Sequence, residues 1–240
     1  MHPEHAALLG ELRTSAGAKQ QGGFDLKGYH GSAEPVLGVR APQMRRIAKA
    51  WAAAHTSEAA GETLAVVSSL FQGASHDEKV LGAVLLGYCR RARAAAGPRD
   101  LEGWLDHLAG WAQVDSLYQN TFPAEQLLAD WPAWNALIER LARDPNINKR
   151  RAALVLLQGV VRYSDDPRLS ALAFAMIERL KGERAVLITK AVSWLLRALA
   201  ARHRAETEGY LDREAANLPA IAVRETRTKL ATGRKAKARA

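Results

Sequence analysis

The feature that most constrains the fold is a charged position that recurs inside helical patterns. Five predicted helices carry a charged residue just ahead of a run of small and apolar residues, and these positions are separated by 36, 36, 39 and 37 residues. In chain order they are Lys79, Asp115, Arg151, Lys190 and Arg227. A period in the high thirties accommodates two helices per repeat. The chain is therefore predicted to stack pairs of helices.

The composition supports this prediction. Hydrophobic residues make up 48% of the 240 residues, whereas aromatic residues make up only 6%, and few segments show the alternation of a half-buried strand. We expect one all-α domain over residues 1–240, built as a HEAT-like helical repeat solenoid. Such a solenoid would have a right-handed superhelical curve, and its second helices would line a basic concave groove.

The glycines and prolines divide the chain. A short helix is expected at about residues 2–14, and residues up to 41 should then be irregular because they are rich in glycine. Helical patterning begins at Pro42 and continues to the basic end, where residues 232–240 are expected to form a flexible tail. Later helices should begin near Ser57, His76, Pro98, Gly110, Pro132, Ile147, Asp166, Glu183, Glu206 and Pro219.

Several classes of function are not indicated. No segment resembles a signal peptide or a membrane span, so we expect a cytoplasmic protein with no membrane role, associated with the nucleoid when bound to DNA. The single cysteine, Cys89, lies in an apolar stretch and is expected to be a small buried residue. No HExxH, CxxC or phosphate-loop pattern occurs, so neither a metal nor a cofactor is expected.

The charge is concentrated at the C-terminal end. The formal net charge is +9, and residues 224–240 contain seven basic residues and one acidic residue. A basic segment favours polyanions through counterion release, although many such segments are simply solvated ends. Charge alone therefore leaves both alternatives open.

Trp194 is predicted to lie on the polar side of its helix. At about 100° per residue, Lys190, Trp194 and Arg197 fall within about 60° of one another, opposite a stripe of leucine, valine and alanine. An indole among cations is better explained as a contact surface for nucleic acid than as core. The remaining tryptophans, except Trp111, are expected in the core: Trp51, Trp104, Trp131 and Trp134.

Two further helices show the same arrangement. Trp111, Asp115 and Tyr118 share one side of their helix, with Tyr118 as an uncertain wall residue. The helix from Ile147 is apolar except for a stripe of Arg151, Gln158 and Arg162, of which the last two are expected to be solvated groove residues. A structural alternative remains for each: Trp111 could be core, and Asp115 could pair with Arg151.

At these positions the sequence resembles the AlkD-type DNA alkylation repair family of HEAT-like DNA glycosylases. The stretches that carry the resemblance are VLGVRAPQMRRIAK (36–49), WAQVDS (111–116), KRRAAL (149–154) and TKAVSWLLR (189–197). The resemblance implies that Trp111 and Trp194 contact the lesion nucleotide, that Asp115 is the catalytic carboxylate and that Arg151 holds a nearby phosphate. Predicted DNA contacts are Arg151, Lys190, Arg197, Arg162, Arg45, Arg46 and Lys229.

The sequence departs from the family at two places. Better-characterised members have an amphipathic helix near the N-terminus, whereas residues 17–35 are glycine-rich and are predicted not to form it, as in a branch of the family that lacks it. An aromatic residue is also frequent in the family where Asn148 stands.

Three functions are therefore considered. The first is a monomeric, monofunctional glycosylase that removes N3- or N7-alkylated purines from double-stranded DNA without deep base flipping. The second is a non-catalytic protein that binds distorted or branched DNA. The third is a scaffold for a protein partner with the basic end as a tether.

Overall fold

The computed structural model describes residues 1–16, 31–118 and 122–234, and every regular element in these ranges is a helix. The all-α prediction is confirmed. The chain divides into two compact units, Met1–Thr121 and Phe122–Ala240, which we describe separately. No helix within the described ranges is both long and apolar enough to cross a membrane.

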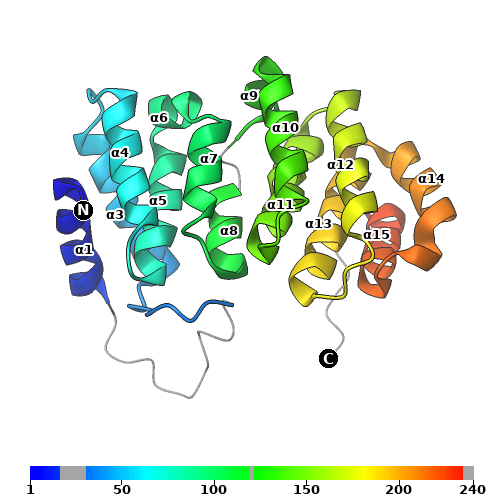
Figure 1. The fold of residues 1–240 in the computed structure, drawn as a ribbon, viewed down its shortest axis with the longest axis horizontal. Coiled ribbons are helices and arrows are strands. Elements are labelled where there is room, and N and C mark those ends of the chain that lie inside the picture. Colours follow the sequence, from blue (N-terminus) through cyan, green and yellow to red (C-terminus); the bar gives the residue numbers. More distant parts are fainter. Residues whose placement is uncertain (17–30, 119–121, 235–240) are drawn as a thin grey trace. The chain divides into compact units, whose positions relative to one another are not determined.

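The first unit is built around one central helix (Figure 1). Helix α5 packs against α3 and α8 along one row and against α4 and α6 on another side. The short N-terminal helix α1 contacts α3, α4 and α5. The bounds are α1 Pro3–Ser15, α3 Ala41–Ala54, α4 Ala60–Phe71, α5 His76–Tyr88, α6 Arg90–Ala95, α7 Pro98–Leu105 and α8 Gly110–Tyr118.

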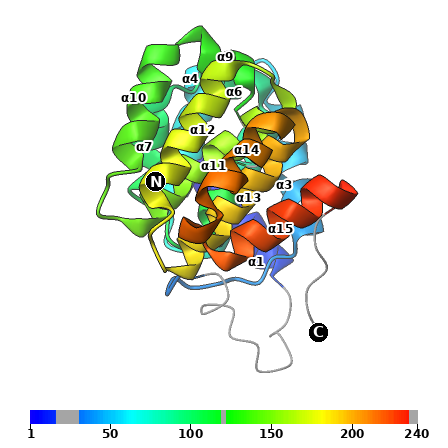
Figure 2. The ribbon, with the colours of Figure 1, turned by 90° about the vertical axis from the view of Figure 1, so that its right-hand side faces the viewer.

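The second unit has two rows of helices, and Figure 2 looks along these rows from their C-terminal end. Helices α11, α13 and α15 pack consecutively and form an inner row, while α10, α12 and α14 cover them on the other side. The bounds are α9 Ala124–Ala129, α10 Trp131–Leu141, α11 Ile147–Tyr163, α12 Pro167–Leu180, α13 Val186–Arg202, α14 Arg204–Glu214, the 3₁₀ turn η1 Ala215–Asn217 and α15 Ala220–Thr232.

Capping residues explain three of the predicted helix starts. Ser75 accepts a hydrogen bond from the backbone N–H of Glu78, and the Glu78 carboxylate accepts one from the Ser75 N–H, which makes a capping box at the start of α5. The side chains of Asn146 and Asp166 cap α11 and α12, because each accepts a hydrogen bond from a backbone N–H group in the first turn of its helix. These caps agree with the predicted starts at His76, Ile147 and Asp166.

Two short helices were not predicted. Helix α6 begins directly after Cys89, and α9 directly after Pro123. Each has only six residues, too few for an apolar periodicity to be visible in the sequence. Cys89 is therefore not inside a helix but at the junction of α5 and α6, where it is half-buried; burial and the Glu58 charge raise its pKa to about 11.

The segment before α3 has no regular secondary structure and is hydrogen-bonded to the first unit. Buried Asp77, at the start of α5, accepts hydrogen bonds from the backbone N–H groups of Leu37 and Val39 at 2.7 and 2.9 Å. The N–H of His76 donates to the carbonyl oxygen of Pro35 at 2.9 Å. We call residues 31–39 the strap. The predicted irregularity of residues 31–40 is confirmed, whereas residues 17–30, where the absence of a family helix was predicted, lie outside the described ranges.

Candidate nucleic-acid site

The candidate site residues lie on three helices, one in the first unit and two in the second. Trp111 and Asp115 are on α8 of the first unit, whereas Arg151, Lys190, Trp194 and Arg197 are on α11 and α13 of the second. The structure fixes the surroundings of each group within its own unit. Their convergence on one nucleotide stays a prediction.

On α8, burial increases along the predicted stripe. Trp111 is half-buried, Asp115 is 4% exposed and Tyr118 is 3% exposed. Burial raises the pKa of Tyr118 well above its usual range. Tyr118 is thus part of the core and not of a solvent-facing wall.

The strap helps to set the position of α8. Glu34 forms an ion pair with buried Lys79 of α5, and its other carboxylate oxygen accepts a hydrogen bond from Gln113 Nε2 at 2.6 Å. Gln113 Oε1 in turn accepts from the backbone N–H of Ala109 at 2.8 Å, just before α8. Gly31 lies against the start of the helix, since a Cβ placed on it would be 3.9 Å from Trp111 Cδ1.

The stripe on α13 is the more open one. Lys190 is exposed, and Trp194 and Arg197 are half-buried, whereas the opposite side of the helix is buried. Within the described ranges, the side chains of Lys190 and Trp194 make no hydrogen bond or ion pair with the protein. The cation and the indole are therefore available to a ligand.

Arg197 is held from one side. Its Nε lies 3.1 Å from Glu225 Oε2 and donates to the carbonyl oxygen of Ser193 at 3.2 Å. Burial lowers the pKa of Arg197, and the charge of Glu225 opposes that shift. Neither Ser193 nor Glu225 was singled out from the sequence, because Glu225 comes from the next inner helix and only the packing of α13 against α15 brings it here.

On α11, one prediction needs correction, because Gln158 was expected to be solvated but is only 8% exposed. Arg151 is 5% exposed, and its Nη1 donates to the carbonyl oxygen of Leu187 in α13. The reason is that α11 packs along α13 and is also covered by α12. Arg162 is exposed, as expected, and lies over the ring of Tyr163 at 5.5 Å.

The remaining predicted contacts differ in their surroundings. Arg45 and Arg46 are exposed on α3, and neither has a hydrogen bond or ion pair among the residues that the structure describes. Lys229 donates from Nζ to the carbonyl oxygen of Gly233 at 2.6 Å and so caps its own helix. Asn148 is half-buried in the first turn of α11.

Part of the basic end is helical. Arg224, Arg227 and Lys229 belong to α15, whose last residue is Thr232. Residues 235–240, which make up most of the predicted tail, lie outside the described ranges.

Three of the other four tryptophans are core residues, as predicted. Trp51, Trp104 and Trp134 are at most 7% exposed. Trp131 was expected in the core but is half-buried, with the guanidinium of Arg168 at 5.7 Å from its ring. Its position in the first turn of α10 leaves one face of the ring to Arg168.

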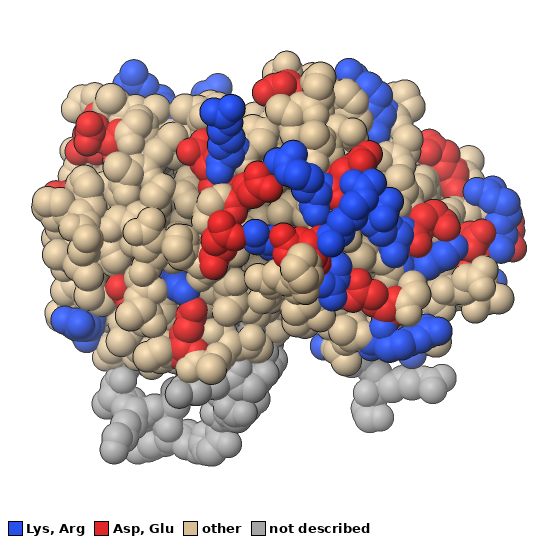
Figure 3. All heavy atoms as spheres, in the orientation of Figure 1, with Lys and Arg blue, Asp and Glu red and all other residues tan. Residues whose placement is uncertain are grey.

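The face of the molecule seen in Figure 3 carries intermixed charges over the outer helices of the second unit. Ion pairs on these helices include Arg143–Glu139, Arg168–Asp166 and Lys181–Glu178. This pattern is typical of a solvated surface and not of a binding site for a polyanion.

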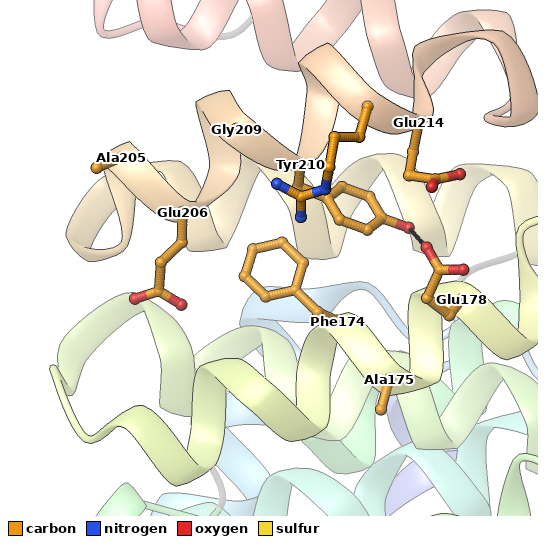
Figure 4. Close-up of a pocket in the computed structure, with 9 residues that line it drawn as sticks. Phe174, Ala175, Glu178, Ala205, Glu206, Gly209, Tyr210 and Glu214 are labelled. Atoms are coloured by element: carbon orange, nitrogen blue, oxygen red, sulfur yellow. Dashed lines mark hydrogen bonds between the residues drawn. The ribbon is translucent and has the colours of Figure 1, made fainter.

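A hollow of about 530 Å³ lies between α12 and α14 (Figure 4). Phe174 and Tyr210 face each other in it, with ring centroids 4.9 Å apart, and the Tyr210 hydroxyl donates to Glu178 Oε1. Lys181 pairs with both Glu178 and Glu214. Both carboxylates therefore have partners within the protein, and these contacts join α12 to α14.

The described residues contain no group of three or more histidine, cysteine, aspartate or glutamate side chains placed to hold a metal ion. The first unit offers a carboxylate and a half-buried indole on α8, and the second unit offers a half-buried indole and cations on α13. These groups suit an anionic polymer with a cationic or flat component.

Comparison with known proteins gives the family. A family model described as DNA alkylation repair enzyme matches residues 11–230. The chain belongs to this DNA alkylation repair family. Membership makes DNA repair the setting of the protein and DNA its substrate.

A solved structure shares the fold. It is described as a predicted DNA alkylation repair enzyme from Enterococcus faecalis, and the match covers 96% of this chain and 97% of that chain with a TM-score of 0.69. At 16% identity, this similarity supports the fold alone. No curated protein matches the sequence significantly.

Proposed function

We propose that this member of the DNA alkylation repair family is a monofunctional DNA glycosylase. Its substrate would be double-stranded DNA carrying purines alkylated at N3 or N7, and its products a free alkylpurine and an abasic site. It would act as a monomer on chromosomal DNA, at the first step of base excision repair, and without drawing the base into a deep pocket.

The observation that carries this proposal is the placement of two tryptophans. Trp111 and Trp194 are half-buried on inner helices of different units, whereas Trp51, Trp104 and Trp134 are core residues. Asp115 follows Trp111 by one helical turn, and Lys190 precedes Trp194 by one turn. Each indole is thus paired with a charge suited to DNA chemistry.

The chemistry needs few groups. N3- or N7-alkylation gives the purine a positive charge, so the C1′–N bond can break with its electron pair passing to the base, which leaves as a neutral alkylpurine. The sugar then has oxocarbenium character, and the Asp115 carboxylate would stabilise it and orient the water that adds to C1′. The proton lost by that water passes to the carboxylate or to solvent.

The indoles and cations would support the same step. Each indole face could contribute about 0.5–2 kcal/mol of cation–π stabilisation to the cationic sugar. Asp115 is only 4% exposed, and a carboxylate withdrawn from bulk water interacts more strongly with a nearby cation. Arg151, Lys190 and Arg197 would hold the flanking phosphates, with Arg45, Arg46, Arg162 and Lys229 farther along the backbone.

A second function is favoured by a specific observation. Residues 17–35 are glycine-rich and are predicted not to form the amphipathic helix of better-characterised family members, and a non-catalytic protein that binds distorted or branched DNA needs no such helix. The same exposed cations would serve this function.

One experiment separates the two functions. The protein is incubated with methylated duplex DNA and, in parallel, with a duplex carrying a neutral lesion, and released bases are identified by mass spectrometry. We expect free 3-methyladenine and 7-methylguanine and no release of the neutral base. Salt-dependent binding to branched DNA without release of any base would support the second function and contradict the first.

A further inference from the structure

Arg197 is a mostly buried guanidinium that the protein holds only at Nε. Its side chain is 16% exposed, and that of Glu225 is 13% exposed. The Nε group accounts for both contacts, with Glu225 Oε2 at 3.1 Å and with the carbonyl oxygen of Ser193 at 3.2 Å. The remaining four N–H donors belong to the two Nη groups.

Among the residues that the structure describes, neither Nη group of Arg197 donates a hydrogen bond to the protein. Withdrawing a guanidinium from water is costly unless its donors are satisfied, so an anion at the Nη edge would be favourable. The exposed Lys190 lies on the same side of α13 and adds a second positive charge.

Glu225 fixes the orientation of this group. Its Oε2 atom accepts a hydrogen bond from Ser193 Oγ at 2.8 Å as well as pairing with Arg197 Nε. Ser193 and Arg197 are one turn apart on α13, whereas Glu225 lies on α15. The carboxylate therefore connects α13 and α15 next to the Nε side of the guanidinium.

We propose that Glu225 is a positioning residue for a phosphodiester subsite formed by Arg197 and Lys190. It holds the Nε side of the guanidinium, so that both Nη groups face a backbone phosphate of the DNA. This inference rests on the proposed function only in taking DNA as the ligand, and it requires no base release.

The proposal predicts an effect of Glu225 on DNA affinity that is opposite to the effect of its charge. An acidic residue next to a DNA-binding surface repels the phosphates, so on charge alone its removal should strengthen binding. If Glu225 orients Arg197, removal of its carboxylate should weaken binding instead, because the guanidinium loses its fixed geometry. Charge and positioning thus predict opposite outcomes for the same substitution.

The test is binding of the full chain to unmodified duplex DNA, measured by fluorescence anisotropy at several salt concentrations. We expect Glu225→Ala to weaken binding about fivefold, and Glu225→Gln, which keeps an acceptor for Ser193 Oγ and an oxygen beside Arg197 Nε, to stay within about twofold of wild type. Arg197→Ala should weaken binding about tenfold and reduce the salt slope by about 1.

The double variant shows whether Glu225 acts through Arg197. In the Arg197→Ala background, Glu225→Ala should cause no further loss of affinity, since the group that it positions is absent. Glu208→Ala is the control for charge: its carboxylate is 45% exposed on α14 and pairs with Arg204. Its removal should leave affinity unchanged or slightly raise it.

Each outcome decides the proposal. Binding by Glu225→Ala that equals or exceeds wild type would overturn it, as would an equal loss in the Arg197→Ala background. Thermal melting of each variant identifies loss of fold. If Glu225→Ala does not fold, the DNA affinity of Glu225→Gln is compared with that of wild type at intermediate salt, and this comparison decides. Absence of wild-type binding to duplex DNA would overturn this proposal and the proposed function together, whereas tight binding without base release would overturn only the latter.

Discussion

Lys79 and Lys190 occupy the same position of the repeated pattern but have opposite surroundings. Lys79, on α5 of the first unit, is 6% exposed, pairs with Glu34 of the strap and donates to the carbonyl oxygen of His107. Lys190, on α13 of the second unit, is exposed and has no partner within the described ranges. A recurring charge along the chain therefore marks a recurring place in the fold and not a recurring role.

The other members of the pattern follow the same division. Asp115 and Arg151 are buried like Lys79, whereas Arg227 is exposed like Lys190. Lys79 holds the strap and the His107 carbonyl oxygen to the first unit, whereas Lys190 and Arg227 of the second unit face the surroundings.

The largest effect on stability is expected from Lys79, and Lys190 is its matched control. Lys79→Met should lower the free energy of unfolding by about 2–4 kcal/mol, because Glu34 and the carbonyl oxygen of His107 lose a buried cation. Lys190→Met should change it by less than about 0.5 kcal/mol. Urea denaturation of both variants measures the difference, and equal losses would contradict the contrast.

Two glycines, one in each unit, sharpen the comparison of the units. A Cβ on Gly82 of α5 would lie 3.2 Å from Leu70 Cβ and 3.4 Å from the carbonyl oxygen of Val67, whereas one on Gly159 of α11 would have nothing within 4 Å. Gly82→Leu should therefore destabilise by about 1–3 kcal/mol. Gly159→Ala should stabilise by about 0.5–1 kcal/mol, because alanine favours the helix.

Thermal unfolding of the two glycine variants gives the shift in each midpoint. The expected result is a lower Tm for Gly82→Leu and a slightly higher Tm for Gly159→Ala. A Gly82→Leu variant as stable as wild type would show that α4 and α5 are not in the close contact described here.

The smallest effect is a pH dependence in the first unit. Burial alone would raise the pKa of Glu78, but hydrogen bonds from Ser75 and His5 bring it below the ordinary value of 4.5. Because the folded pKa is the lower one, this stabilisation is present above about pH 4.5 and is lost as the pH falls through the folded pKa. Glu78→Gln should reduce that loss.

The measurement for this effect is the urea midpoint between pH 6 and pH 3. Wild type should lose more stability over the interval than Glu78→Gln, and a matched variant, Glu139→Gln on α10, should behave as wild type because Glu139 lies in an exposed pair with Arg143. Parallel curves for wild type and Glu78→Gln would contradict the assignment.

Much of the fold could be predicted from the sequence because its signals are local. Apolar periodicity and the glycines and prolines predicted the longer helices to within a few residues, and caps at Ser75, Asn146 and Asp166 account for three of their starts. Periodicity also predicted which side of α13 carries Lys190, Trp194 and Arg197. Short helices such as α6 were missed, since six residues do not complete two turns.

The surroundings of the candidate site could not be predicted in the same way. Gln158 and Tyr118 looked like surface residues on a helical wheel, but packing against neighbouring helices buries them. The contact of Glu225 with Arg197 joins two helices, and the contact of Glu34 with Gln113 joins the strap to α8. Such pairings depend on how helices pack, which periodicity within one helix does not reveal.

The central claim is that Asp115 stabilises a cationic sugar while DNA is held by the cations of the inner helices. Single-turnover release of 7-methylguanine from a methylated duplex, compared for wild type and Asp115→Asn, tests it most directly. We predict release by wild type, at least about 100-fold slower release by Asp115→Asn, and equal affinity of both for the duplex. Release at the wild-type rate by Asp115→Asn, or none by a wild-type protein that binds the duplex, would contradict the account.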